Sequence, residues 1–225
     1  MEVFLALALG FAPSLIWLAF FLREDEHPEP RRMIAKAYIW GGLSSFAALF
    51  FELATNGLLS KLMLTLPRLF EENLSVFLGF AVIEEIVKFG FIYILVRKSP
   101  AFDEPVDGMI YMITGALGFA AAENLFLVFS GSQQDIFGVI ILRFIGATLL
   151  HALSSAIVGH HWARGIKYHM EGRLVFVGLL LASIFHAFFN LLVFKFDDIL
   201  IYPTAFLVLI GFFVLYDFEE LKRMG

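Results

Sequence analysis

Residues 74–96 read LSVFLGFAVIEEIVKFGFIYILV, an apolar run interrupted near its middle by three charged side chains. A helix rises about 1.5 Å per residue and the bilayer core is about 30 Å thick, so about 20 apolar residues are enough to cross it. Glu84, Glu85 and Lys88 are costly at that depth, where ionisable side chains usually face a bundle interior and serve a function. This segment therefore predicts both a membrane helix and a candidate site.

The rest of the chain repeats the apolar pattern. Of its 225 residues, 60% are hydrophobic and 16% charged, and the mean hydropathy is +0.84. Soluble domains are about 45–50% apolar and about 25% charged. We therefore expect an all-α, polytopic membrane bundle with no separate soluble domain. Its seven predicted transmembrane helices cover 3–22, 35–59, 74–96, 108–129, 136–162, 174–196 and 199–216.

The distribution of basic residues predicts the orientation. Alternate connections and the C-terminal end carry 11 Lys or Arg residues, whereas the opposite side carries 3. Because cytoplasmic loops are enriched in basic residues, we expect the N-terminus outside and the C-terminus in the cytoplasm. The net charge of −5 and the lack of a basic cluster argue against nucleic acid as a partner. The absence of Cys excludes disulfides and thiolate metal sites.

Several ionisable side chains are expected near one level of the membrane. Counting along each helix places Glu84 and Glu85 near the middle, with His186 at similar depth and His151 at or just past it. Glu123 lies somewhat nearer the outer face. Such carboxylates and imidazoles can act as general bases or metal ligands, or can form a structural ion-paired cluster.

The pairing of the charges has two solutions. Glu84 and Lys88 are i,i+4 and within reach of each other, but Lys88 could instead hold whichever glutamate is not catalytic. The two carboxyl groups would then differ in protonation, as a general base and its neighbour should. Glu52 and Arg143 share a second level, and we expect them to form a structural pair.

Further polar side chains are open to several interpretations. His186 and Asn190 are i,i+4, so they share one helix face. They could stabilise an oxyanion or bind helices together, and the imidazole could ligate a metal. Asn124 follows Glu123 on a face of small residues that favours close packing. The remaining expectations concern the membrane surfaces: an amphipathic outer loop at 60–73, and solvated side chains at the cytoplasmic interface for His160, His161 and His169.

The order of these elements resembles the PrsW family of intramembrane proteases, within the wider CAAX-protease and bacteriocin-processing superfamily. The matching pieces run over roughly 80–195. They are Glu84-Glu85-x-x-Lys88, Asp103-Glu104-x-x-Asp107-Gly108, the segment 118–124 ending in Glu123-Asn124, His151, and His186-x-x-x-Asn190.

The resemblance implies hydrolysis of a peptide bond in a membrane-anchored protein or peptide substrate at the lipid bilayer. The apolar spans along the chain predict a single transmembrane domain over 1–225, in a multi-pass protein of the cell membrane, and with the resemblance the catalytic core is expected at about 74–196. Carried over, the catalytic residues are Glu84, Glu85, His151 and His186, with Asn190 as the oxyanion donor. Lys88, Glu123 and Asn124 would support them.

The cofactor question stays open, with a slight preference for a metal-free, glutamic-type mechanism in which Glu84 or Glu85 activates water. A zinc ion is the alternative, and its candidate ligands are Glu84, Glu85, Glu123, His151 and His186. Two other functions fit buried carboxylates and imidazoles: a proton-coupled secondary transporter, and a non-catalytic membrane scaffold with the same fold. The absence of an internal repeat argues against the transporter.

Overall fold

The protein is a bundle of long helices, described here from a computed structural model of residues 3–65, 72–130, 135–196 and 200–225. These residues contain no strand. The helices are α1 Val3–Phe21, α2 Arg31–Thr65, α3 Glu72–Val96, α4 Asp107–Ser130, α5 Ile136–Ile145, α6 Ala147–Lys167, α7 Glu171–Lys195 and α8 Ile201–Lys222. The predicted all-α bundle is therefore confirmed.

Six segments are long and apolar enough to cross a membrane: α1, α2 up to Thr55, α4, α5 with α6, α7 and α8. α3 is also long, with 25 residues, but the three charges in its centre set it apart from the others by composition. Many large apolar side chains lie on the outside of the bundle, including Ile94, Leu53 and Phe212, each at least 68% exposed. Such a surface suits lipid rather than water, so the chain is a multi-pass integral membrane protein.

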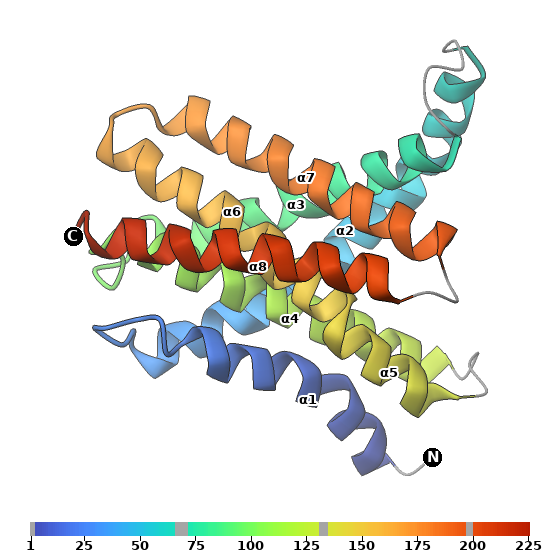
Figure 1. Cartoon of the computed structure of the whole chain (residues 1–225), viewed down its shortest axis with the longest axis horizontal. Helices are drawn as coiled ribbons and strands as arrows, with labels where there is room; N and C mark the ends of the chain where they lie inside the picture. Colours follow the sequence, from blue (N-terminus) through green and yellow to red (C-terminus); the bar gives the residue numbers. More distant parts are fainter. Residues whose placement is uncertain (1–2, 66–71, 131–134, 197–199) are drawn as a thin grey trace.

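The two ends of the bundle differ in the chain segments they carry. The C-terminus lies at the same end as the α1–α2 and α6–α7 connections, and α1 begins at the opposite end (Figure 1). Six basic residues lie in these two connections or in the adjoining helix ends: Arg23, Arg31, Arg32, Arg164, Lys167 and Arg173. The arrangement has the alternation that the predicted orientation requires.

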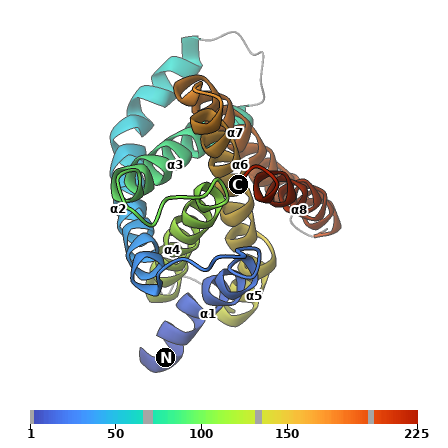
Figure 2. The same ribbon diagram turned by 90° about the vertical axis from the view of Figure 1, so that its left-hand side faces the viewer.

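α4 occupies the centre of the bundle, packed against α1, α2 and α6, as the end-on view in Figure 2 shows. Its glycines let neighbouring backbones approach closely. A Cβ on Gly118 would collide with the carbonyl oxygen of Tyr38 on α2, and one on Gly159 of α6 would collide with that of Gly108 on α4. Close packing of the small-residue faces, which the sequence predicts, is confirmed.

Two predicted segments differ in detail from the structure, although the first lies within one candidate membrane span, Ile136–Lys167. The predicted span 136–162 is two helices, because the backbone departs from helical geometry at Gly146, where φ is −95° and ψ is −99°. Its N–H still donates to the carbonyl oxygen of Leu142 at 2.8 Å. Part of the predicted 60–73 loop belongs to α2, which runs to Thr65; residues 66–71 lie outside the described part of the chain.

Two neighbouring carboxyl groups, those of Glu29 and Asp107, lie at the end of the bundle that carries the C-terminus. Oδ2 of Asp107 accepts hydrogen bonds from the backbone N–H groups of Asp103 and Glu104. The hydroxyl of Tyr111 donates to Glu29, which is buried in the α1–α2 connection. Burial raises the pKa of Glu29 to about 8, with the neighbouring Asp107 adding to the effect. Glu29 is therefore largely protonated at neutral pH.

Candidate active site

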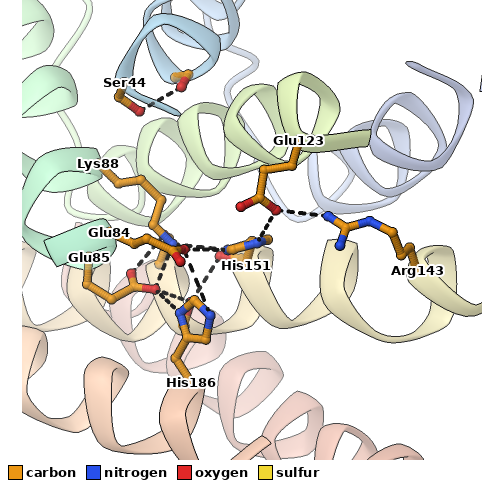
Figure 3. Close-up of polar contacts among 11 residues, drawn as sticks. Ser44, Glu84, Glu85, Lys88, Glu123, Arg143, His151 and His186 are labelled. Atoms are coloured by element: carbon orange, nitrogen blue, oxygen red, sulfur yellow. Dashed lines mark hydrogen bonds and ion pairs between the residues drawn. The ribbon is translucent and has the colours of Figure 1, made fainter. Parts of the chain in front are cut away.

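The centre of the site is an ion pair on α3. Nζ of Lys88 donates to Oε1 of Glu85 at 2.6 Å, and both side chains are completely buried. Glu85 also accepts from Ser154 at 3.0 Å and Ser155 at 3.4 Å, and its Oε1 lies 3.0 Å from Nδ1 of His186. Of the two pairings open in the sequence, Lys88 thus holds Glu85 (Figure 3). The Glu85 carboxylate is fully occupied by partners and has no room for a substrate.

Each of the two histidines has one nitrogen against a carboxylate. Nδ1 of His186 lies beside Glu85, as above, and Nε2 of His151 lies 3.0 Å from Oε2 of Glu123. The two rings meet edge to face, with their centroids 5.1 Å apart. A carboxylate behind an imidazole fixes its tautomer and its orientation, so the opposite nitrogens, Nδ1 of His151 and Nε2 of His186, point in defined directions.

Those opposite nitrogens converge on Glu84. Its Oε2 lies 3.8 Å from Nδ1 of His151 and 3.9 Å from Nε2 of His186. This oxygen is buried and has no hydrogen-bond partner among the described residues. Because buried polar atoms are nearly always satisfied, Glu84 is the carboxylate with unused bonding capacity.

Glu123 extends the network towards the α5–α6 break. Its Oε2 accepts from Nη2 of Arg143 at 2.8 Å, and Nε of Arg143 donates to Oδ1 of Asn124 at 2.6 Å. Asn124 in turn lies 3.4 Å from the hydroxyl of Thr148. The predicted pair of Glu52 with Arg143 is wrong, since Arg143 bonds Glu123 and Asn124. Residue counting gives the depth of each side chain but not which helices are neighbours. The helix that carries Arg143, α5, packs against α1, α4 and α6, and α4 carries Glu123 and Asn124.

The charges of this network do not balance. Three carboxylates, those of Glu84, Glu85 and Glu123, face two permanent cations, Lys88 and Arg143. One negative charge is left over in a buried site, where an uncompensated charge is costly. Because Glu85 and Glu123 have cationic partners, the surplus belongs to Glu84. A proton or a metal ion would neutralise it.

The residues fit a zinc ion. Oε2 of Glu84 and one nitrogen from each histidine lie within 4.8 Å of one another, and zinc sites with three protein ligands of this kind leave a position for water. Each histidine also has the supporting carboxylate that is usual behind a metal-bound imidazole. Of the five predicted ligands, the structure thus brings three together: Glu84, His151 and His186. Glu85 and Glu123 instead contact the outward-facing nitrogens of the two histidines. Nζ of Lys88 lies 3.2 Å from Nδ1 of His151 and would have to yield that nitrogen to the ion.

Asn190 lies beside the cluster rather than within this hydrogen-bonded core. It lines a cavity of about 530 Å³ formed by α5, α7 and α8 with Phe77 of α3. Arg143 and Gly146 line the same cavity, which is otherwise mainly apolar. The cavity therefore reaches the network at Arg143, the ion-pair partner of Glu123.

Ser154 and Ser155 also belong to the site, although neither is among the candidate residues taken from the sequence. Both are buried and bond Glu85. Their spacing of three and four residues from His151, on the same helix face, was the available signal. A further expectation is wrong: His160 is 4% exposed rather than solvated. It is covered by α8, whose Asp217 and Glu220 face it.

The fold and the site define a polytopic membrane protein with a buried constellation of carboxylates and imidazoles. Comparison with known proteins places it in a class of membrane proteases. The family described as "PrsW family intramembrane metalloprotease" matches residues 29–216, and the chain belongs to this PrsW family of intramembrane proteases.

Relatives named Protease PrsW occur in several bacteria. The protein of Geobacillus kaustophilus is 30% identical over 175 residues, which cover 76% of this chain and 71% of the relative. Those of Oceanobacillus iheyensis and Bacillus subtilis are each 24% identical, covering 96% and 94% of this chain and 94% and 93% of theirs. No solved structure matches the chain.

Proposed function

We propose that the chain hydrolyses a peptide bond of a membrane-anchored substrate at the site formed by Glu84, His151 and His186. The observation that carries this proposal is the buried Oε2 of Glu84, which has no hydrogen bond within the described part of the chain and faces one nitrogen of each histidine. Three such groups around one point can hold the water that attacks a carbonyl carbon. Membership of a protease family supports this reaction over proton-coupled transport.

We further propose that these three side chains hold a zinc ion. The carboxylate behind each histidine, the surplus negative charge and the family description support zinc over the metal-free alternative. A zinc ion held there would polarise the attacking water. Glu85, fixed by Lys88 and two serines, would hold His186 in its orientation, and Glu123, fixed by Arg143, would do the same for His151.

Glu123 is our proposed proton carrier. It is the carboxylate of the network with substantial exposure, and its partner Arg143 lines the cavity. Because Glu123 lies behind His151, on the side of the ring away from Glu84, it would exchange protons with the attacking water and the leaving amine through the imidazole or an intervening water. Asn190, on the wall of the same cavity, would donate its amide N–H to the carbonyl oxygen as negative charge develops there.

The cavity suits a substrate that arrives from the lipid. Its lining includes Phe189, Phe194 and Leu142, with Arg143 and Asn190 towards the network. An apolar segment can lie against the former while its backbone reaches the latter. A helix must unwind locally there, because the carbonyl groups of an intact helix are occupied by its own hydrogen bonds.

Metal content separates the proposed roles. Purified protein should contain zinc and should lose cleavage of a membrane-anchored reporter with a chelator, regaining it with zinc. Glu84→Gln and His186→Ala should lose both zinc at this site and cleavage. Glu123→Gln should keep the zinc and lose cleavage. Full activity without metal would refute the zinc ion and favour Glu84 as the base; cleavage by Glu84→Gln would refute the site itself.

A further inference from the structure

A second cluster of ionisable side chains joins α6 to α8, away from the proposed active site. Nδ1 of His160 lies 3.3 Å from Oδ2 of Asp217, and its Nε2 lies 3.4 Å from Oε2 of Glu220. The other oxygen of Glu220 faces Nε of Arg164 at 3.6 Å. His160 precedes the end of α6 by seven residues, so the cluster lies towards the end of the bundle that carries the C-terminus.

The histidine of this cluster has unused bonding capacity. Its side chain is 5% exposed, and neither ring nitrogen has a hydrogen-bond partner among the described residues. The neighbouring carboxylate oxygens are close enough but wrongly directed for hydrogen bonds. A buried imidazole normally satisfies at least one nitrogen, and a doubly protonated ring would direct an N–H at each carboxylate. In this geometry neither ring nitrogen forms a hydrogen bond with these carboxylates, so the lone pair of one nitrogen is available to a metal ion.

The donors and their spacing suit a divalent transition metal. One imidazole and two carboxylates are ligands that zinc accepts, and one atom from each residue falls within a 4.8 Å group. Two ligands about 2.0–2.1 Å from a tetrahedral ion are about 3.4 Å apart, close to the 3.3 Å between His160 and Asp217. The charges agree as well, since two carboxylates face one arginine.

We propose that His160, Asp217 and Glu220 form a second divalent-cation site, separate from the hydrolytic one. Asp217 and Glu220 keep side-chain exposures of 18% and 28%, so an ion can reach them without unfolding of the bundle. The remaining coordination position would be filled by water.

An ion at this second site would also affect the cavity beside the proposed active site, an inference that rests on the proposed function. α8 lies at the periphery of the bundle, packed against α6 and α7 (Figure 2). Its first turns supply Pro203 and Thr204 to the cavity wall, and α6 carries His151. An ion bound between α6 and α8 would hold α8, which forms part of the cavity wall, in a fixed position relative to α6, which carries His151.

The test is zinc stoichiometry of the purified full chain in detergent, loaded with Zn²⁺ alone and freed of excess by gel filtration. Wild type should bind two ions, and His160→Ala or Asp217→Asn one. His161→Ala, the matched control on the neighbouring position of α6, should bind two. His151→Ala with His186→Ala removes the first site and should leave one ion, which His160→Ala then abolishes. The thermal midpoint should rise with Zn²⁺ in this double variant and stay constant once His160 is also replaced.

The outcomes are distinguishable. The second site is refuted if folded His160→Ala binds as much zinc as wild type, or if the folded double variant binds none and its midpoint ignores Zn²⁺. A protonated His160 that merely pairs with the carboxylates would give this result. If the double variant instead binds as much as wild type while His160→Ala loses its ion, the second site stands and zinc at the proposed active site fails.

Discussion

Two adjacent glutamates on α3 should respond in opposite ways to the same conservative substitution. Glu85→Gln removes the anionic partner of Lys88, whose side chain has no exposed surface and whose Nζ lies 2.6 Å from the lost charge. Glu84→Gln removes a charge that has no cationic partner in hydrogen-bond contact. Both changes keep the size and shape of the side chain.

The magnitude follows from these environments. Removing one partner of a buried ion pair costs about 3–5 kcal/mol, because it leaves the other charge uncompensated. Glu85 in addition accepts from Ser154 and lies against His186, so its loss disturbs three helices at once. We therefore expect Glu85→Gln to lower the free energy of unfolding by about 3–5 kcal/mol. With both proteins freed of metal, Glu84→Gln should cause no loss of stability, and it should abolish cleavage under all conditions.

The assay is reversible unfolding in mixed micelles with increasing SDS, followed by circular dichroism and paired with cleavage of a membrane-anchored reporter. A compensating variant, Glu85→Gln with Lys88→Met, provides the control. Replacing both members of a buried pair by uncharged groups is often close to neutral, so stability should return while cleavage stays low. Equal destabilisation by Glu84→Gln and Glu85→Gln, or no rescue by the second substitution, would refute the assignment of Lys88 to Glu85.

Three further predictions test other parts of the structure. Arg143→Leu should reduce reporter cleavage about 10–100-fold by releasing the carboxylate behind His151, with the zinc content as a second readout; unchanged activity would contradict this role. Gly41→Ala should destabilise the bundle by about 1–3 kcal/mol, because its Cβ would collide with the carbonyl group of α4, whereas the control Gly90→Ala meets no atom within 4 Å and should not lower the thermal midpoint. The pKa of Glu29 is raised from 4.5 to about 8 in the folded state, so between these values the folded protein keeps a proton that the unfolded chain has released. The free energy of unfolding should therefore fall between about pH 5 and 8. Glu29→Gln should remove this slope from a plot of thermal midpoint against pH, and an identical slope in the variant would contradict its origin in Glu29.

The helical bundle could be predicted because its signal is local. Each apolar run had to become a helix, since no other structure satisfies the backbone in lipid except a closed barrel. Depth along each helix also followed from residue counting, and it placed Glu84, Glu85, His151 and His186 at one level. The structure brings these four together in one network.

The side-chain pairings could not be predicted because they depend on which helix faces which. Glu52 and Arg143 share a depth, yet α5 contacts α4 and thereby gives Arg143 to Glu123. His160 is expected to be solvated at the cytoplasmic interface, yet α8 covers it. The break at Gly146 is a tertiary effect as well, since a glycine within an apolar run is compatible with an uninterrupted helix.

Which of the two glutamates pairs with Lys88 depends on hydrogen-bond donors from other helices. On α3 alone, Lys88 can reach the carboxylate three residues before it or the one four before it. Ser154 and Ser155 of α6 and His186 of α7 all lie against Glu85, so a carboxylate placed there gains several bonds that one at Glu84 would not. Lys88 therefore pairs with Glu85, whose carboxylate is already held by these bonds. Glu84 is then left without a cationic partner in hydrogen-bond contact among the described residues. The uncompensated carboxylate between two oriented imidazoles is therefore a consequence of how fully its neighbour is satisfied, and in our proposal it is the feature that would let the site take up a water or a metal ion.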